Sequence, residues 1–166
     1  MRTEDFNLIS GFLKERSGLV LSPDKLYLLE NRLTPVARKR GMGGLDEIVQ
    51  AIRTGRDEPL FRDITEAMTT NESLFFRDSR PFEQFRNMVL PRILESRAAE
   101  RSIRIWSAAC STGQEPYSIA MCLREEEAKL AGWRIEIIAT DLSTEVLEKA
   151  KVGMYSQLET SKYSDF

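Results

Sequence analysis

The chain has 166 residues, 42% hydrophobic and 30% charged, and a net charge of −2, which is typical of a globular protein and argues against a broad nucleic-acid-binding surface. No apolar run approaches the ~20 residues needed to span a membrane, and residues 1–5 are charged and lack a signal-peptide core, so we expect a cytoplasmic protein that does not insert into the membrane. Histidine is absent, and Cys110 and Cys122 have no metal-ligand spacing, which excludes His-based triads and predicts no metal site.

The first 70 residues are predicted to form a small bundle of helices. Apolar residues recur with helical spacing in residues 5–16, which end before Gly18, a common helix stop. A second helix is expected to begin at Ser22, with a proline in its first turn, and Pro35 is expected to kink or divide it. Third and fourth helices are predicted over residues 45–52 and from Asp57 onward.

A basic cluster occupies the second predicted helix and its end: Arg32, Arg38, Lys39 and Arg40. Cations at such a place can complement the helix dipole and form a solvated face. They can also form a docking surface for an acidic partner helix. Composition alone leaves both interpretations open.

Residues 70–78 read T-N-E-S-L-F-F-R-D and follow no regular period. One interpretation is a linker or helix cap in which the two phenylalanines are buried. The other is a ligand site, because Asn71, Ser73 and Arg77 lie close together in the chain. A long helical stretch follows over residues 81–101, which we expect to be interrupted or bent at Pro91.

A strand, a tight turn and a helix are predicted where the chain reads R-I-W-S-A-A-C-S-T-G-Q-E-P-Y-S, residues 104–118. The strand covers residues 103–108 and the helix residues 114–130. A second strand over residues 133–139 and a helix over residues 144–151, capped by Ser143 or Asp141, complete a β-α-β-α order. This order implies parallel strands joined by a right-handed crossover. Residues 154–166 are assigned no structure.

The carboxyl ends of these strands predict a nucleotide- or nucleoside-type cofactor site, because open α/β sheets bind ligands there. Asp141 ends the second strand and can bind ribose hydroxyls, although it follows Gly113 by more than the ~20 residues of the dinucleotide-binding pattern. The G-x-G-x-x-G pattern is missing, which disfavours a NAD-linked oxidoreductase and a P-loop. Glu115 would repel a phosphate and suits a cationic ligand, such as one with an amino group or a nearby sulfonium. The alternative interpretation is an ordinary glutamate in the first turn of the helix, where its charge interacts favourably with the helix dipole.

Three separated motifs resemble the CheR-type methyltransferases, which modify chemoreceptor glutamates with S-adenosylmethionine: residues 70–78, residues 105–118 and A-T-D at residues 139–141. The resemblance implies an α/β Rossmann-like (class I methyltransferase) domain preceded by a small all-α domain for substrate recognition. Residues 1–70 would form the all-α domain and residues 71–101 a linker and long helix. Residues 102–166 would form the first βαβα part of the catalytic domain.

The resemblance also assigns expected functions to individual residues. Asn71, Ser73, Arg77, Glu115 and Asp141 match cofactor-contacting positions, with Glu115 at the methionine part and Asp141 at the ribose; Ser73 stands where the family often has threonine, and Gln114 replaces a frequent glutamate. Substrate contacts are expected from Arg32, Arg38, Lys39 and Arg40, which would face the helical cytoplasmic domain of a chemoreceptor. Arg77 or Tyr117 would orient the glutamate carboxylate, which is ionised at neutral pH and needs no general base.

The family's catalytic domain continues further, with more strands and an asparagine-containing motif that closes over the adenosine. We therefore expect this chain to be the front half of the enzyme, to bind S-adenosylmethionine or its product S-adenosylhomocysteine weakly or not at all, and to self-associate. Two alternatives are a non-catalytic, helix-binding signalling module and a methyltransferase with another substrate, a small molecule or nucleic acid; the charge and the helical first domain speak against nucleic acid.

Overall fold

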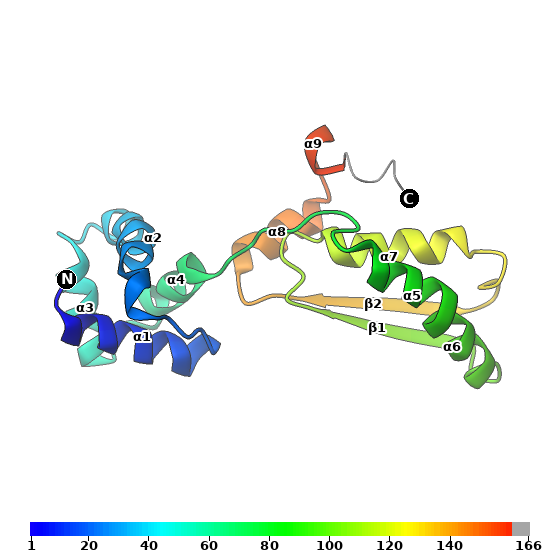
Figure 1. Ribbon diagram of the computed structural model, residues 1–166, viewed down its shortest axis with the longest axis horizontal. Helices are drawn as coiled ribbons and strands as arrows, with labels where there is room; N and C mark the ends of the chain where they lie inside the picture. Colours follow the sequence, from blue (N-terminus) through cyan, green and yellow to red (C-terminus); the bar gives the residue numbers. More distant parts are fainter. Residues whose placement is uncertain (161–166) are drawn as a thin grey trace. The chain divides into compact units, whose positions relative to one another are not determined.

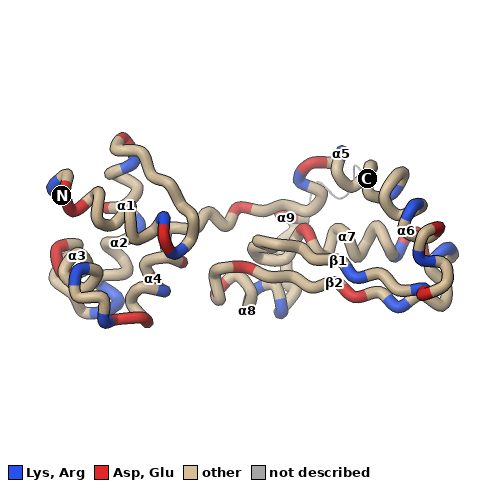
Figure 2. Tube along the Cα trace, turned by 90° about the horizontal axis from the view of Figure 1, so that it is seen from below, with Lys and Arg blue, Asp and Glu red and all other residues tan. Residues whose placement is uncertain are grey.

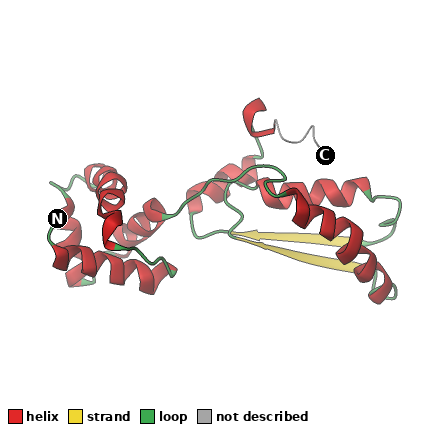
Figure 3. Ribbon diagram, in the orientation of Figure 1, coloured by secondary structure: helices red, strands yellow, loops and turns green. Residues whose placement is uncertain are grey.

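The computed structural model describes residues 1–160 and divides into two compact units, Met1–Thr70 and Asn71–Phe166 (Figure 1). The first unit is all helical, and the second combines helices with a two-stranded sheet (Figure 3). Among the described residues, none of the helices has the length and apolarity needed to cross a membrane. The predicted fold class, an all-α domain followed by an α/β domain with parallel strands, is confirmed.

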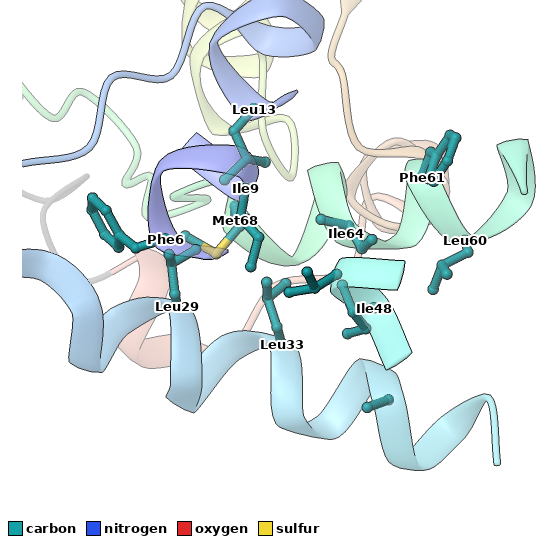
Figure 4. Packing of buried hydrophobic residues seen from close by; sticks show 12 residues of the cluster. Phe6, Ile9, Leu13, Leu29, Leu33, Ile48, Leu60, Phe61, Ile64 and Met68 are labelled. Atoms are coloured by element: carbon teal, nitrogen blue, oxygen red, sulfur yellow. The ribbon is translucent and has the colours of Figure 1, made fainter. Parts of the chain in front are cut away.

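The first unit consists of helices α1 (Thr3–Ser17), α2 (Leu26–Lys39), α3 (Leu45–Thr54) and α4 (Glu58–Met68). Their apolar faces meet in one core (Figure 4), where side chains of all four helices are fully buried: Ile9, Leu13, Leu29, Leu33, Ile48, Leu60 and Ile64. Full burial of such a side chain contributes roughly 1.5–3 kcal/mol. The helical periodicity of the sequence therefore predicted this bundle correctly.

The helix ends in the first unit follow their expected signals with two corrections. Gly18 adopts the left-handed conformation after α1, and the Asp57 carboxylate accepts the Leu60 N–H at 3.0 Å to begin α4. Ser22 instead precedes a short 3-10 turn, Pro23–Lys25, and makes no side-chain cap. Pro35 does not divide α2, which continues to Lys39. Proline removes only one main-chain hydrogen bond of the helix, and because Pro35 is exposed, its ring lies outside the core.

The second unit has two parallel strands, β1 (Ser102–Ala108) and β2 (Arg134–Thr140), paired in register from Ser102↔Arg134 to Ala108↔Thr140. Helix α7 (Gln114–Glu125) forms the crossover, and α8 (Thr144–Val152) and α9 (Gln157–Thr160) follow β2. The β-α-β-α order and the parallel pairing are confirmed, but α7 ends at Glu125, earlier than predicted. Apolar residues of both strands pack with α6 and α7 in one cluster, whereas Trp106 on the opposite face is 70% exposed.

The helical stretch before β1, expected to be interrupted or bent at Pro91, is irregular ahead of that residue. It consists of α5 (Ser79–Gln84), a π-helical segment Phe85–Val89, and α6 (Leu90–Ser96). Proline has no N–H to donate to the preceding turn, and the π-helical segment changes the main-chain hydrogen-bond register just before it. The interruption therefore lies before Pro91, and the last helix ends at Ser96 instead of near residue 101.

Candidate functional site

The turn between β1 and α7, residues 109–113, has an unusual main-chain conformation. Three of its residues have positive φ: Ala109 at 58°, Ser111 at 51° and Gly113 at 99°. Only glycine adopts such angles freely, and each other residue there costs of order 1–3 kcal/mol. The surroundings must therefore hold this turn in place.

Hydrogen bonds from two other segments fix the first half of the turn. The Cys110 N–H donates to the Thr140 carbonyl at 2.9 Å, and the Ser111 N–H donates to Asp141 Oδ2 at 2.8 Å. The Ser111 hydroxyl donates to the Asn71 carbonyl at 2.6 Å. The turn is thus attached both to the end of β2 and to the segment that begins the second unit.

Asp141 follows β2 and connects the ends of the two strands through its carboxylate. Its Oδ2 accepts the Ser111 N–H and its Oδ1 accepts the Ser143 N–H at 2.9 Å. A carboxylate offers about four acceptor sites, so the half-buried Asp141 keeps acceptor capacity for the hydroxyls of a ligand. The helix cap of α8 is Ser143, whose hydroxyl accepts the Val146 N–H, and not Asp141.

Glu115 lies in the first turn of α7 and is exposed. Its Oε1 accepts the hydroxyl of Ser107, a buried residue of β1, at 2.7 Å. Burial, and then the charges of Asp141 and Glu115, raise the pKa of the Cys110 thiol above its usual value. Glu115 is thus bonded to the end of β1 before the turn, and Asp141 to the turn itself.

Residues 71–78 pass beside this turn and bury their aromatic residues. Phe75 and Phe76 pack with Phe82 and Cys122, and the Phe76 N–H donates to the Ser118 hydroxyl at 3.1 Å. The expected burial of the two phenylalanines is confirmed. The same segment brings the main chain of Asn71 to the turn, whereas Arg77 stays exposed and donates to the Glu72 carbonyl at 3.0 Å. Ser73 is half buried, with no hydrogen bond to the other predicted site residues within the described chain.

Two tyrosines close the second half of the turn, and the sequence analysis missed one of them. The Tyr117 hydroxyl donates to the Ala150 carbonyl at 3.0 Å, so Tyr117 connects α7 to α8. The Tyr155 hydroxyl donates to the Thr112 carbonyl at 2.7 Å. Tyr155 lies in the stretch that was assigned no structure; the available signal was the sequence S-Q-L-E that follows it, a capping-box pattern that predicts a helix start.

The four predicted substrate-binding residues of the first unit have different surroundings. Arg32 donates to the Thr69 carbonyl at 2.6 Å, and Arg40 forms an ion pair with Asp63 at 2.8 Å. Arg38 and Lys39 are exposed, and the structure shows no ion pair for either within residues 1–160. Basic and acidic positions lie beside one another along this unit (Figure 2).

Two family models match consecutive parts of the chain. The family described as "CheR methyltransferase, all-alpha domain" matches residues 4–69, and "CheR methyltransferase, SAM binding domain" matches residues 71–165. "Chemotaxis protein methyltransferase 1" of Pseudomonas aeruginosa is 44% identical over 157 residues, covering 93% of this chain and 57% of the relative.

Two further relatives agree. "Chemotaxis protein methyltransferase Cher2" of Pseudomonas putida is 40% identical over 161 residues, covering 95% of this chain and 58% of the relative. "Chemotaxis protein methyltransferase" of Escherichia coli is 35% identical over 156 residues, covering 93% and 51%. The chain spans about half the length of the curated relatives it matches. With both family domains present in order, the chain belongs to the CheR methyltransferase family, and its second unit is of that family's S-adenosylmethionine-binding type.

Proposed function

We propose that this chain binds S-adenosylmethionine at the turn of residues 109–113 and the start of α7, and takes part in transferring its methyl group to glutamate side chains of a chemoreceptor in bacterial chemotaxis. The observation that carries the proposal is the placement of two carboxylates beside one turn at the carboxyl ends of two parallel strands: Glu115 accepts the Ser107 hydroxyl and Asp141 accepts the Ser111 N–H. Family membership supports the reaction class.

The groups at the turn fit this cofactor better than a nucleotide with phosphates. The two carboxylates are acceptors only, which suits the ribose hydroxyls and the ammonium group of S-adenosylmethionine and repels phosphate. Asp141 would hold the ribose and Glu115 the amino group. The raised pKa of Cys110 keeps its thiol protonated, and a protonated thiol is a poor nucleophile toward an activated methyl group.

The proposed reaction needs positioning and no general base. When bound, the cofactor supplies an electrophilic methyl group, which the substrate carboxylate takes as an ester while the electron pair of the broken C–S bond stays on sulfur. Alignment of the reacting groups can contribute ~7–11 kcal/mol. Arg77 is the better candidate to orient the substrate carboxylate, because its guanidinium is exposed, whereas the Tyr117 hydroxyl already donates to Ala150.

The first unit would bind the acidic helices of the receptor through its basic residues. Arg38 and Lys39 are the residues proposed to make direct contact, since both are exposed. Arg32 and Arg40 already have partners within the unit, so they would support the surface and add to its positive potential.

A labelled-methyl assay tests the reaction on three substrate classes: the cytoplasmic domain of a chemoreceptor, RNA and small carboxylic acids. The expected result is label in the receptor domain alone, released as methanol by alkali because methyl esters hydrolyse. Label in RNA or in small acids would overturn the substrate assignment. Binding of the receptor domain without transfer, under saturating cofactor, would favour the non-catalytic module.

Cofactor binding is tested separately by calorimetry and by amide chemical shifts during titration with S-adenosylhomocysteine. We expect a dissociation constant above the low-micromolar range, with shift changes concentrated in residues 109–115 and at Asp141. Shifts that stay unchanged there at millimolar ligand would overturn the cofactor site. Replacement of the exposed Glu148 by alanine is the control, because it removes a carboxylate of the same unit outside the turn.

A further inference from the structure

We infer that Tyr155 is a positioning residue: its hydroxyl, bonded to the Thr112 carbonyl, holds the turn of residues 109–113 in the conformation that receives the cofactor. The cofactor part of this inference rests on the proposed function. Tyr155 itself would not touch the reacting atoms.

Tyr155 lies directly against the turn. Besides the 2.7 Å hydrogen bond to Thr112, its hydroxyl lies 2.8 Å from the point where a Cβ on Gly113 would be. The same point is 3.0 Å from the Ala150 Cβ and 3.2 Å from Tyr117 Cε2. Glycine is therefore needed at position 113 for two reasons: its φ is 99°, and neighbouring side chains occupy the space that a Cβ would take.

The ring of Tyr155 is itself held by aromatic neighbours. It makes edge contacts with Phe75, at 4.8 Å between ring centroids, and with Tyr117, at 5.9 Å. Burial raises the pKa of Tyr155 to about 12, so the hydroxyl remains a donor over the physiological pH range. The bond to Thr112 is thus made by a fixed and permanently protonated group.

A second contact comes from the helix that follows Tyr155. Ser156 and Glu159 form a capping box, in which the Ser156 N–H donates to Glu159 Oε2 at 2.8 Å. The other oxygen of Glu159 accepts from Gln114 Nε2 at 3.4 Å, and Gln114 in turn accepts the Thr112 hydroxyl at 2.8 Å. Residues 155–159 therefore contact residues 112–114 at two points, and we call them the clasp.

The clasp completes a set of attachments that come from separate parts of the chain. Asn71, Thr140 and Asp141 hold residues 110 and 111. The clasp holds Thr112 and Gln114, the half of the turn that leads into α7. Without it, the positive-φ conformation of Ser111 and Gly113 would lose one of its external restraints, and the N-terminus of α7 would no longer be fixed relative to Asp141.

The test compares Tyr155→Phe with Tyr27→Phe, a matched change at an exposed tyrosine of the first unit. Amide hydrogen exchange without cofactor is expected to become faster at Gly113 and Tyr117 in Tyr155→Phe only, because both N–H groups donate to carbonyls of this turn, those of Cys110 and Gly113. Affinity for S-adenosylhomocysteine should fall by about 2–12-fold, the equivalent of the one hydrogen bond that this change removes. Unchanged exchange at both amides would overturn the inference, and so would unchanged affinity.

Two further variants keep the test decisive. If Tyr155→Phe does not fold, Glu159→Ala removes only the second contact and should give the same changes at a smaller size; no change would count against the clasp. Gly113→Ala should be less damaging in the Tyr155→Phe background, since the hydroxyl at 2.8 Å is then gone. If the wild-type chain binds no S-adenosylhomocysteine, the proposed function fails, while the exchange rates still decide whether Tyr155 positions the turn.

Discussion

Replacing Asp141 with alanine removes the acceptor that connects the ends of the two strands. The carboxylate accepts two main-chain N–H groups, from Ser111 at 2.8 Å and from Ser143 at 2.9 Å. Hydrogen bonds to a charged group contribute about 1.5–3 kcal/mol each. Asp141 is half buried, so water can replace part of this loss, and we expect the free energy of unfolding of the second unit to fall by about 2–4 kcal/mol.

The assay is unfolding by denaturant, monitored by the near-UV absorbance or fluorescence of the second unit. Glu148→Ala is the control variant. Glu148 forms an exposed pair with Lys151 on α8, and such surface pairs contribute about 0–1 kcal/mol. Asp141→Asn should be intermediate, because the amide oxygen can accept one of the two N–H groups. A loss below about 0.5 kcal/mol in Asp141→Ala, the range of ordinary surface substitutions, would refute the connecting function of Asp141.

Asp141→Asn also separates stability from cofactor binding. The variant keeps the shape of the side chain but removes its negative charge, so the turn should remain while the acceptor for ribose hydroxyls weakens. We expect a larger loss of S-adenosylhomocysteine affinity than of stability. Equal affinity in Asp141→Asn and wild type would assign Asp141 to structure alone.

Other predictions address the core, the pH dependence, the reaction and association. Leu33→Ala, at a fully buried position, should cost the first unit about 2–5 kcal/mol in chemical unfolding; a smaller cost would contradict the packing. Asp5 has a lowered pKa, chiefly through its hydrogen bond to Arg2. The ionised Asp5 therefore stabilises the fold above the unfolded pKa of about 3.9, and this stabilisation is lost as the pH falls through the folded pKa. In Asp5→Asn, the free energy of unfolding should depend less on pH in the acid range. Arg77→Ala should lower kcat/KM for receptor methylation more than Tyr117→Phe, and unchanged values in both would remove these residues from the mechanism. The open edge of β2 should promote self-association, which a monomer in light scattering at high concentration would contradict.

The elements of this protein could be predicted from the sequence because their signals are local. The spacing of Leu29 and Leu33 indicated one face of a helix, and both are fully buried in α2. The small residues around Gly113, between an apolar run and a helical pattern, indicated the strand, turn and helix that the structure contains. Periodicity and turn chemistry involve neighbours a few residues apart, so a single sequence is sufficient for them.

Tertiary structure alone decided how the turn is held, because its restraints come from residues distant in the chain. Asp141 contacts a residue 30 positions earlier, and Tyr155 one that is 43 positions earlier. Arg32 likewise donates to a carbonyl 37 positions away, so a residue of the basic cluster fixes the end of α4. The periodicity of a sequence does not indicate which carbonyl will accept a hydrogen bond from a distant hydroxyl or guanidinium. The packing of the whole unit determines these partners.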